Sequence, residues 1–412
     1  MRTHMFTIER HQHAVGHGFF HTASVHAHGG PRFNYVYDCG AKKDKTILAP
    51  AIAAYLESLG RSVIDLLVLS HFHDDHVSGL DRLLARTKID TVIIPYIPDA
   101  ERLLLVAQLL THPAAGWDDV ALPADPEKWF RSRGVDRILS VYPSDETSST
   151  ADGPEQSPEP RQNGGKELGW ELRLGSEKGQ VLKTDDDSFS DGSPVVLTHE
   201  HMGVLEFLFF CWNAKEQADR YKKAIMHETD KTPTELLHPD QLLLTLHNAS
   251  LRKKIVKCYR DVSRKRLNWT TLCLRVGPAG SIYESRYSLV RCGTGPTPLL
   301  IHRMDTSEGA WLGTGDLELA DPKISSAFFE RYAPHGPVRT LSLPHHGSHK
   351  NFDGELLSLL KPSVVFATCP PKSRYHPDEK VVRAVSGTGT VFLKVDESVE
   401  SQLHESVCLC RS

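Results

Sequence analysis

One short run of the sequence constrains the fold and the chemistry of this chain more than any other. Residues 71–76 read His-Phe-His-Asp-Asp-His and directly follow the apolar stretch 64–69. Imidazole nitrogens and carboxylate oxygens are ligands that Zn²⁺, Mn²⁺ and iron accept. His71 and His73 lie two positions apart, so on an extended end of a strand they point to the same side. The run therefore predicts a metal site between a strand and the helix expected at about 77–86.

The chain contains 23 histidines, so a loop that is rich in histidine by chance is the plain alternative. Three later segments favour the metal site, because each presents His or Asp after an apolar, strand-like stretch. A glycine before a carboxylate lets the backbone approach a metal closely, although Gly-Asp alone is typical of an ordinary turn. The three segments are Gly315-Asp316, His345-His346-Gly347-Ser348 and Tyr375-His376-Pro377.

Length and composition limit the classes of protein to consider. The 412 residues suffice for one large domain or two of ordinary size. A net charge of −4 does not indicate a bulk nucleic-acid binder, although a local basic groove stays open. The eight cysteines form no Cys-x-x-Cys pair, which favours buried thiols in a reducing compartment. With no signal-peptide pattern and no apolar run of about 18–20 residues, we expect a cytoplasmic protein without a membrane partner.

The alternation of strand-like and helix-like stretches up to residue 142 predicts an α/β layered fold. Residues 143–194 are rich in Ser, Asp, Glu, Gly and Pro, so we expect a mobile acidic loop there, with 170–174 as an edge strand. Strands and helices follow, and the last helix ends in a basic stretch. The predicted parts are an N-terminal half at 1–142, an insertion at 143–266 and a C-terminal half at 267–412.

The order of these motifs resembles the metallo-β-lactamase fold superfamily. In detail it resembles the ComEC/Rec2-like branch, found in DNA-uptake proteins and in stand-alone bacterial hydrolases. The matching elements are His-x-His-x-Asp-His, Gly-Asp, Leu-Pro-His-His-Gly-Ser and Tyr-His-Pro, with further likeness at 38–40 and 268–274. The resemblance covers about 5–100 and 268–400 and implies a four-layer αββα sandwich, with an inserted loop and helical segment. The metals are then expected at the edge between the two sheets.

The resemblance also implies a set of metal ligands for two divalent ions, with zinc or manganese expected. One carboxylate bridges the two ions, and a pair of donors from the first motif binds each of them. The implied ligands are His71 and His73 for the first ion, Asp75 and His76 for the second, and Asp316 between them.

Further residues complete this implied site. His345 or His346 would supply another ligand, and His346 is slightly favoured. Asp38 would orient a ligand from behind, as outer partners of metal-bound histidines do. Many relatives have an additional histidine between the first motif and Gly-Asp, and this sequence has no clear match. His302 and His376 are the two candidates for it, so the ligand set of the first ion stays open.

Two metal ions about 3.5–4 Å apart can hold a hydroxide that attacks an electrophilic centre. Asp75 would ligate and also accept a hydrogen bond from this nucleophile. His345, His349 or His376 would protonate the leaving oxygen, because imidazole titrates near neutrality. Such a site suits a phosphodiester, an ester, a lactone or an amide.

Two features favour a phosphodiester in DNA or RNA. The later His motifs resemble the branch associated with DNA degradation, and residues 252–266 hold eight cationic residues against one Asp. A basic helix of this kind could follow a phosphate backbone. A solvated helix face explains the charges equally well, and so does a partner for the acidic loop, which would then be autoinhibitory. The expected nucleic-acid contacts are Arg252, Lys253, Lys257, Arg260 and Arg264.

The leading hypothesis is therefore a metal-dependent phosphodiesterase or nuclease that acts on DNA, RNA or a nucleotide. A hydrolase of small esters, lactones or phosphocholine-type substrates would use the same metals with a narrower pocket. A third hypothesis is a non-catalytic or effector-type interaction protein, whose insertion at 143–266 binds a protein partner.

Overall fold

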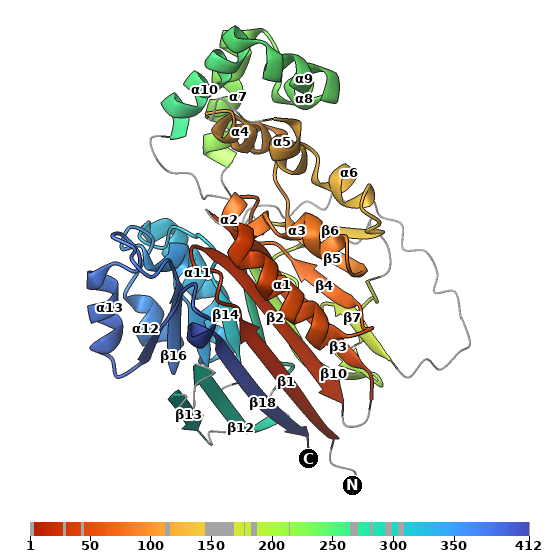
Figure 1. Ribbon diagram of the computed structural model, residues 1–412, viewed down its shortest axis with the longest axis vertical. Helices are drawn as coiled ribbons and strands as arrows, with labels where there is room; N and C mark the ends of the chain where they lie inside the picture. The colour runs from red at the N-terminus through yellow and green to blue at the C-terminus, as the bar shows by residue number, and fades with distance from the viewer. Residues whose placement is uncertain are drawn as a thin grey trace.

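Two β-sheets pack face to face in the computed structural model of the chain, with helices on their outer faces (Figure 1). The amino and carboxyl ends lie close together at one end of this sandwich, and a group of helices lies at the other. The structure describes residues 4–27, 30–42, 45–111, 116–144, 169–176, 178–182, 188–213, 215–263, 271–280, 283–292, 299–303 and 309–411.

The first sheet has ten strands in the order β13-β12-β18-β1-β2-β3-β4-β5-β6-β8. From β3 to β8 the neighbours run parallel, whereas β18, β1, β2 and β3 pair in antiparallel register. The central strands read as short apolar runs because both faces of the sheet are covered. The strands are β1 (His4–Gln12), β2 (Gly18–Ala27), β3 (Arg32–Ala41), β4 (Ile64–Val68), β5 (Ile89–Pro95), β6 (Arg137–Tyr142), β8 (Phe189–Ser190), β12 (Tyr283–Cys292), β13 (Leu299–Arg303) and β18 (Leu403–Arg411).

The second sheet has eight strands in the order β17-β16-β15-β14-β11-β10-β9-β7. The strands from β14 to β17 run parallel, and β7 to β11 pair in antiparallel register with their neighbours. The expected edge strand at 170–174 is confirmed as β7. The strands are β7 (Trp170–Leu174), β9 (Val195–His199), β10 (Met202–Cys211), β11 (Leu272–Pro278), β14 (Trp311–Gly313), β15 (Thr340–Ser342), β16 (Val364–Thr368) and β17 (Val391–Val395).

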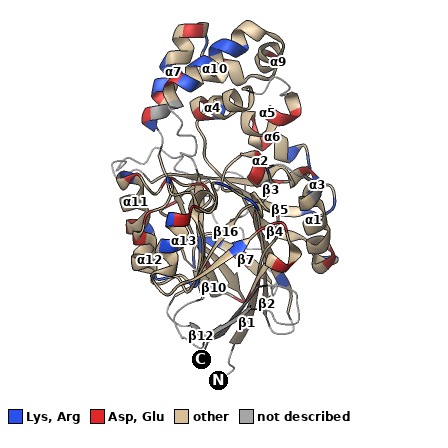
Figure 2. Ribbon diagram, turned by 60° about the vertical axis from the view of Figure 1, so that its left-hand side comes forward, with Lys and Arg blue, Asp and Glu red and all other residues tan. Residues whose placement is uncertain are grey.

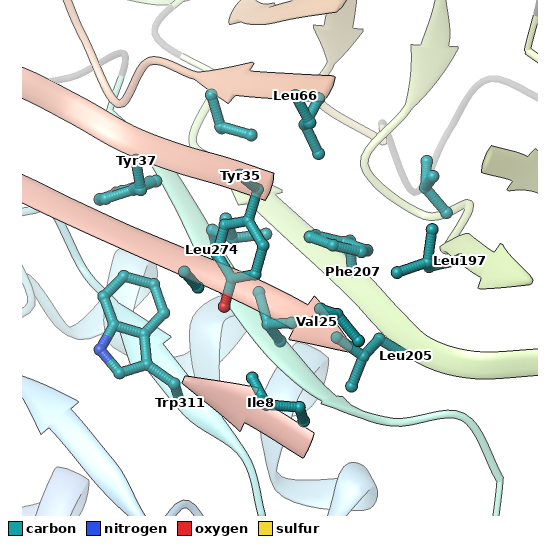
Figure 3. Packing of buried hydrophobic residues seen from close by; sticks show 14 of the residues in the cluster. Ile8, Val25, Tyr35, Tyr37, Leu66, Leu197, Leu205, Phe207, Leu274 and Trp311 are labelled. Atoms are coloured by element: carbon teal, nitrogen blue, oxygen red, sulfur yellow. The ribbon is translucent and has the colours of Figure 1, made fainter. Parts of the chain in front are cut away.

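Three apolar layers hold these sheets and helices together. Between the sheets, side chains such as Tyr35, Phe207 and Trp311 interdigitate (Figure 3). Two further clusters join each sheet to the helices on its outer face. The predicted four-layer αββα fold is therefore confirmed. The covering helices are α1 (Lys45–Leu59), α3 (Leu80–Leu84) and α6 (Pro126–Arg131) on the first sheet, and α11 (Pro322–Tyr332), α12 (Glu355–Leu360) and α13 (Glu379–Ser386) on the second.

Six further helices form a group with an apolar cluster of its own, which we call the helical cap. The cap lies over the end of the sandwich at which α2 (Asp74–Val77) is found (Figure 1). Leu104 of one cap helix and Tyr221 and Ile255 of two others meet in its core. The cap helices are α4 (Asp99–Leu109), α5 (Trp117–Ala124), α7 (Lys215–Thr229), α8 (Pro233–Leu237), α9 (Pro239–His247) and α10 (Ala249–Ser263).

The helical cap and the second sheet both include parts of the predicted insertion at 143–266. The cap combines α4 and α5, which precede residue 143, with α7 to α10, which follow it. The predicted insertion at 143–266 also contributes β7, β9 and β10 to the second sheet. The acidic loop expected at 143–194 is shorter than predicted, because residues 170–174 and 189–190 pair as strands. Residues 145–168, the most acidic part of that loop, lie outside the described residues.

Membrane spans and disulfides can be checked over the described part of the chain. None of its helices is both long and apolar enough to cross a bilayer. Seven described cysteines are free thiols, most of them buried, in agreement with the expected absence of a disulfide scaffold. Burial raises the pKa of thiols such as Cys273 and Cys211 well above the usual value, so these side chains are inert neutral groups.

A buried ion pair ties the two sheets together. Arg10 on β1 and Glu405 on β18 face each other, with Nη1 3.0 Å from Oε2 and side chains only 1% and 2% exposed. Arg10 Nη2 also donates to the carbonyl oxygens of Val276 and Gly309, at 3.3 and 2.9 Å. Thr340 Oγ1 of the second sheet donates to Glu405 Oε1 at 2.9 Å. The pair therefore joins both sheets through hydrogen bonds as well as charge.

The substitution Glu405→Ala would leave the Arg10 guanidinium buried without its carboxylate. We expect it to lower the free energy of unfolding by about 3–5 kcal/mol, the usual cost of breaking a buried pair. The double variant Arg10→Met/Glu405→Leu removes both charges and should recover most of this loss. Urea unfolding followed by circular dichroism measures both. A loss below about 1 kcal/mol for Glu405→Ala, within the range of ordinary substitutions, would contradict this role.

Candidate metal centre

The His and Asp motifs meet at one edge of the sandwich because they follow parallel strands. Carboxyl ends of neighbouring parallel strands lie at the same edge of a sheet. The first motif follows β4, Asp316 follows β14 and His346 follows β15. Four overlapping groups each have donor atoms within 4.8 Å of one another. They are His71/Asp75/His76, His71/His73/Asp316, His76/Asp316/His346 and His17/Asp75/His346.

Two glycines allow the backbone to approach closely enough for this meeting. A Cβ at Gly40 would lie 2.5 Å from the backbone of Asp75 and His76, so α2 can rest on β3 only when this side chain is absent. Gly315 has a φ of +50°, and a Cβ there would lie 2.4 Å from the side chain of Thr271. The Gly-Asp pair is therefore a tight turn that requires glycine and presents Asp316, and the sequence alone could not distinguish it from an ordinary turn.

A buried carboxylate behind the centre fixes two of its histidines. Asp38 accepts hydrogen bonds from Ser70 N at 2.7 Å, from Ser70 Oγ at 2.6 Å and from His76 Nδ1 at 2.7 Å. Ser70 Oγ also lies 2.9 Å from His71 Nδ1. With Nδ1 engaged in this way, Nε2 of His71 and of His76 faces the centre, and neither has a hydrogen-bond partner in the described part of the chain.

Two other histidines are held from opposite sides. His73 Nε2 lies 3.1 Å from Oε1 of Gln108, on cap helix α4, so Nδ1 is the ring nitrogen left for the centre. His346 Nδ1 lies 2.9 Å from Oγ1 of Thr368, at the end of β16, and its buried Nε2 has no hydrogen-bond partner. Both rings are therefore oriented by a contact on the side away from the centre, as the rings of metal-binding histidines usually are.

One side of the centre has the spacing expected of metal ligands. His346 Nε2 and His17 Nε2 lie 3.4 and 3.5 Å from Asp75 Oδ2. His76 Nε2 lies 3.5 Å from Asp316 Oδ1, and His346 Nε2 lies 4.0 Å from the same oxygen. Ligands at 2.0–2.1 Å around a tetrahedral zinc ion are separated by about 3.3–3.4 Å. These residues therefore suit a divalent ion.

The other side of the centre offers fewer donors. His71 Nε2 lies 3.7 Å from Asp316 Oδ2, and His73 completes a group of three. Among the described residues no further histidine joins this group. The candidate His302 lies on β13, which five strands separate from β4 in the sheet, and its side chain is outside the described part. The other candidate, His376, lies at the rim of the site and belongs to none of the four groups.

The rim of the centre is formed by imidazoles from separate loops. The ring of His376 lies 5.4 Å from that of His345 and 5.8 Å from that of His17, centroid to centroid. His345 Nε2 is 3.7 Å from Asp316 Oδ2, and its Nδ1 is 3.0 Å from Asn351 Oδ1. Burial, together with neighbouring His346, lowers the pKa of His17 to about 3 and that of His376 to about 4. These rings are therefore neutral near pH 7.

His349, the third predicted proton donor, points elsewhere. Its Nδ1 is 2.8 Å from Oδ2 of Asp378, the residue that caps the start of α13. The side chain is 47% exposed. His349 therefore contacts the loop before α13, whereas His345 and His376 lie at the rim of the centre.

Burial and charge set the protonation states of the donors. Burial, with help from His76, lowers the pKa of His71 well below its usual value. Burial would raise the pKa of Asp75 and Asp316, but neighbouring imidazoles outweigh it and hold both pKa values well below the usual range. Burial alone would lower the pKa of His76, but the carboxylates of Asp38 and then Asp316 outweigh burial and hold this pKa well above the usual value. The centre therefore attracts positive charge, whether a proton or a metal ion.

Several residues of this centre gave weak signals or none in the sequence. Ser70 and Thr368 are hydroxyl residues at strand ends, and a search for polar groups just before or beyond each ligand loop could have found them. Gln108 comes from a cap helix 35 residues after His73 and carries no local signal. His17 belongs to a His-rich hairpin, and only its three-dimensional position at the start of β2 distinguishes it from the others.

Four of the five predicted nucleic-acid contacts lie on α10 of the cap. Lys257 Nζ is 2.9 Å from Glu228 Oε1, and Arg252 Nε donates to the Leu110 carbonyl at 3.3 Å, so both are engaged within the cap. Figure 2 shows that acidic and basic residues share the surfaces of α7 and α10. Of the remaining predicted contacts, Lys253 and Arg260 are exposed, and Arg264 lies outside the described residues.

Residues 18–176 match the family model described as Metallo-beta-lactamase superfamily. The match spans less than half of the chain, and over that part the sequence is similar to the metallo-beta-lactamase superfamily. Members of this superfamily are generally hydrolases and typically bind divalent metals. The buried His and Asp groups described above could hold such ions. The finer ComEC/Rec2-like branch stays a prediction. No curated protein matches the sequence.

Three solved structures resemble the chain weakly. The metallo-beta-lactamase fold protein YhfI from Bacillus subtilis is 8% identical, with a TM-score of 0.33 over 94% of this chain and 95% of that one. A long form RNase Z from yeast is 10% identical, with a TM-score of 0.34 over 97% and 41%. The subclass B3 metallo-beta-lactamase MEM-A1 from a soil metagenome is 14% identical, with a TM-score of 0.20 over 63% and 92%. Likeness at this level does not indicate a substrate.

The contact at Gly40 can be tested without any assay of activity. Gly40→Ala places a methyl group against the backbone of α2, and we expect it to lower the free energy of unfolding by about 1–3 kcal/mol, as overpacking does. Gly354→Ala is the matched control, since an added Cβ there meets nothing within 4 Å. Urea unfolding compares the two. Equal effects of both substitutions would show that the approach of α2 to β3 is not tight.

Proposed function

We propose that this protein is a hydrolase that uses two divalent metal ions and cleaves a phosphodiester in DNA, RNA or a nucleotide. One observation carries the proposal: the Asp316 carboxylate stands between two sets of imidazoles. Its Oδ2 lies 3.7 Å from His71 Nε2, and its Oδ1 lies 3.5 Å from His76 Nε2. A carboxylate in this position can bridge two ions, the arrangement that two-metal phosphatases and nucleases use.

The two ions would have unequal ligand sets. The first would be held by His71, His73 and Asp316, which leaves a coordination position open, as in catalytic zinc sites. The second ion would have more protein donors around it and would therefore be bound more tightly. Its proposed ligands are Asp75, His76, Asp316, His346 and, from the start of β2, His17.

Bound ions would supply Lewis acidity and lower the pKa of a coordinated water to near neutrality. The remaining steps fall to side chains of this chain. Asp75 would accept a hydrogen bond from the attacking water and so orient it. His345 and His376, at the rim, would place a ring N–H near the leaving oxygen. His349 is excluded from this role because its contact with Asp378 holds it away.

The way in which charge develops during the reaction supports a phosphodiester as the substrate. In phosphodiester cleavage the negative charge spreads over two non-bridging oxygens, and two cations can neutralise it together. A small ester or lactone develops charge on one oxygen only, and a hydrolase of such substrates is the second candidate. A purely structural role, with the cap binding a protein partner, leaves the buried imidazole nitrogens unexplained, because burying polar groups without partners costs stability.

Metal content and turnover test the proposal together. Purified protein should carry close to two equivalents of zinc or manganese by elemental analysis, and it should hydrolyse bis(p-nitrophenyl) phosphate. Asp316→Ala and His71→Ala should lower metal content and reduce kcat by at least about a hundredfold, since ligand loss removes the charge stabilisation. Asp240→Ala, on the exposed surface of α9, is the control.

Two results would contradict this assignment. Protein without transition metal, with both variants as active as the wild type, would rule out the metallohydrolase. Activity on lactones or carboxylic esters, with none on plasmid DNA, single-stranded RNA or the diester, would favour the second candidate.

The proposed nucleic-acid contact of α10 has its own test. Lys253→Glu/Arg260→Glu should weaken cleavage of plasmid DNA. The slope of log KM against log salt concentration should fall by the amount that corresponds to about two lost phosphate contacts. Hydrolysis of bis(p-nitrophenyl) phosphate should not change, because this substrate is too small to reach the cap. Lys323→Glu/Arg383→Glu, exposed on α11 and α13, changes the net charge by the same amount and is the control. If both charge variants behave alike on plasmid DNA, the α10 surface is an ordinary solvated face.

A further inference from the structure

A cavity of about 630 Å³ separates the helical cap from the sandwich, and nothing in the mechanism above uses it. Tyr96 follows β5, Tyr142 ends β6 and Trp212 follows β10, so the sandwich contributes aromatic rings to its wall. From the cap, Glu101 of α4 and Lys222 of α7 are among the lining residues. The volume is that of a typical small-molecule site.

The cavity lies on the same edge of the molecule as the candidate metal centre. β5 pairs with β4, and neighbouring strands are about 4.8 Å apart, so Tyr96 lies roughly one strand away from the end of β4. Helix α4 connects the two sites directly. Gln108 contacts His73, and Glu101 lies seven residues earlier on the same helix, about 10 Å away. A nucleotide can span this separation.

Glu101 is the decisive residue of the cavity wall. Its side chain is only 5% exposed, and no described residue hydrogen-bonds to its Oε2. A buried polar atom without a partner is costly and rare in proteins, so a ligand group that completes its hydrogen bonding would offset the cost. Burial raises the pKa of Glu101 to about 8. Near pH 7 the carboxyl group is therefore mostly protonated, and it can both donate and accept.

The aromatic wall indicates the shape of the ligand. The rings of Tyr96 and Tyr142 stack on each other at 4.2 Å between centroids and 28° between planes, yet they are 40% and 39% exposed. Such exposed stacked rings offer a flat face on which another ring can stack. The charges lining the cavity are balanced, with Lys215 and Lys222 against acidic side chains. The ligand group should therefore be planar, polar and close to neutral.

We propose that this cavity receives a nucleobase of the substrate, with Tyr96 and Tyr142 stacking on its face and Glu101 hydrogen-bonding to its polar edge. Nucleobases are flat, nearly neutral, and carry donors and acceptors side by side on one edge. The inference rests on the proposed function, because the base belongs to a nucleotide whose phosphate lies at the metal centre. It adds a specificity-determining site formed jointly by the cap and the sandwich.

A comparison of two chromogenic diesters distinguishes the contribution of the base to substrate binding from that of the phosphate. The p-nitrophenyl ester of thymidine 5′-phosphate and methyl p-nitrophenyl phosphate share a leaving group, and only the first has a base. For Tyr142→Ala we expect KM to rise roughly 5- to 150-fold for the thymidine ester, with little change in kcat, because stacking is lost equally from ground and transition states. The KM and kcat for the methyl ester should be the same in Tyr142→Ala as in the wild type. Trp117→Ala, with similar exposure outside the cavity, is the matched control.

Calorimetric titration with the free nucleosides of adenine, guanine, cytosine and thymine gives a second readout without catalysis. At least one should bind the wild-type protein, and Glu101→Leu should weaken it by about tenfold or more, the value of a lost hydrogen bond to a buried group. Glu101→Gln keeps a donor and an acceptor and should bind within a few-fold of the wild type. Thermal unfolding should show Glu101→Leu to be as stable as the wild type or more stable, because a buried carboxyl is removed.

The outcomes distinguish the two levels of inference. If neither diester is hydrolysed, the proposed function is contradicted, and the titrations alone decide whether the cavity binds bases. If both diesters are hydrolysed but no nucleoside binds and the KM ratio of the two esters is the same in Tyr142→Ala, the assignment of the cavity is overturned.

Discussion

The hydrogen bonds of Asp38 are the interaction on which the candidate centre depends. This carboxylate is completely buried at the end of β3, with a φ of 59°. It fixes Ser70 and His76 directly, and His71 through the Ser70 hydroxyl. One residue thus determines which nitrogen each ring presents and holds the loop after β4 against β3. The close contact at Gly40 holds the backbone of Asp75 and His76 against β3. The position of the His76 backbone and the tautomer of its ring are therefore fixed by neighbouring residues of β3.

The same arrangement is unfavourable for the protein alone. Among the described residues, several imidazole nitrogens of the centre are buried without a hydrogen-bond partner, and two carboxylates are buried beside them. The pKa shifts show that the centre favours added positive charge. The lowered pKa values of the two carboxylates keep them ionised, and the raised pKa of His76 favours its protonated form. A divalent cation relieves both conditions at once, because it neutralises the carboxylates and takes the imidazole lone pairs. The buried donors of the polypeptide are therefore arranged so that they could hold a divalent metal ion.

Much of this could be predicted from the sequence, because local patterns report local structure. The strand before the first His motif, the helix at 45–59 and the edge strand β7 are all readable from periodicity and composition. The origin of the cap could not be predicted, since α4 and α10 meet only through tertiary packing across more than a hundred residues. For the same reason Gln108 and His17 could not be distinguished from other polar residues. His302 was a reasonable candidate by motif order, and the strand order of the first sheet separates it from the centre.

Helix α4 gives the cap a function beyond shielding the edge of the sandwich. It begins beside the strand that follows β4 in the sheet, lines the cavity with Glu101, and ends its course by contacting His73 through Gln108. A ligand in the cavity and a metal at the centre would therefore act on one rigid element. Any displacement of α4 that accompanies filling of the cavity would be felt at the His73 ring, whose orientation the Gln108 contact holds. If the cavity binds the substrate as proposed, Glu101 and the Gln108 that orients His73 are two turns apart on the same helix, and binding would be linked to chemistry through α4.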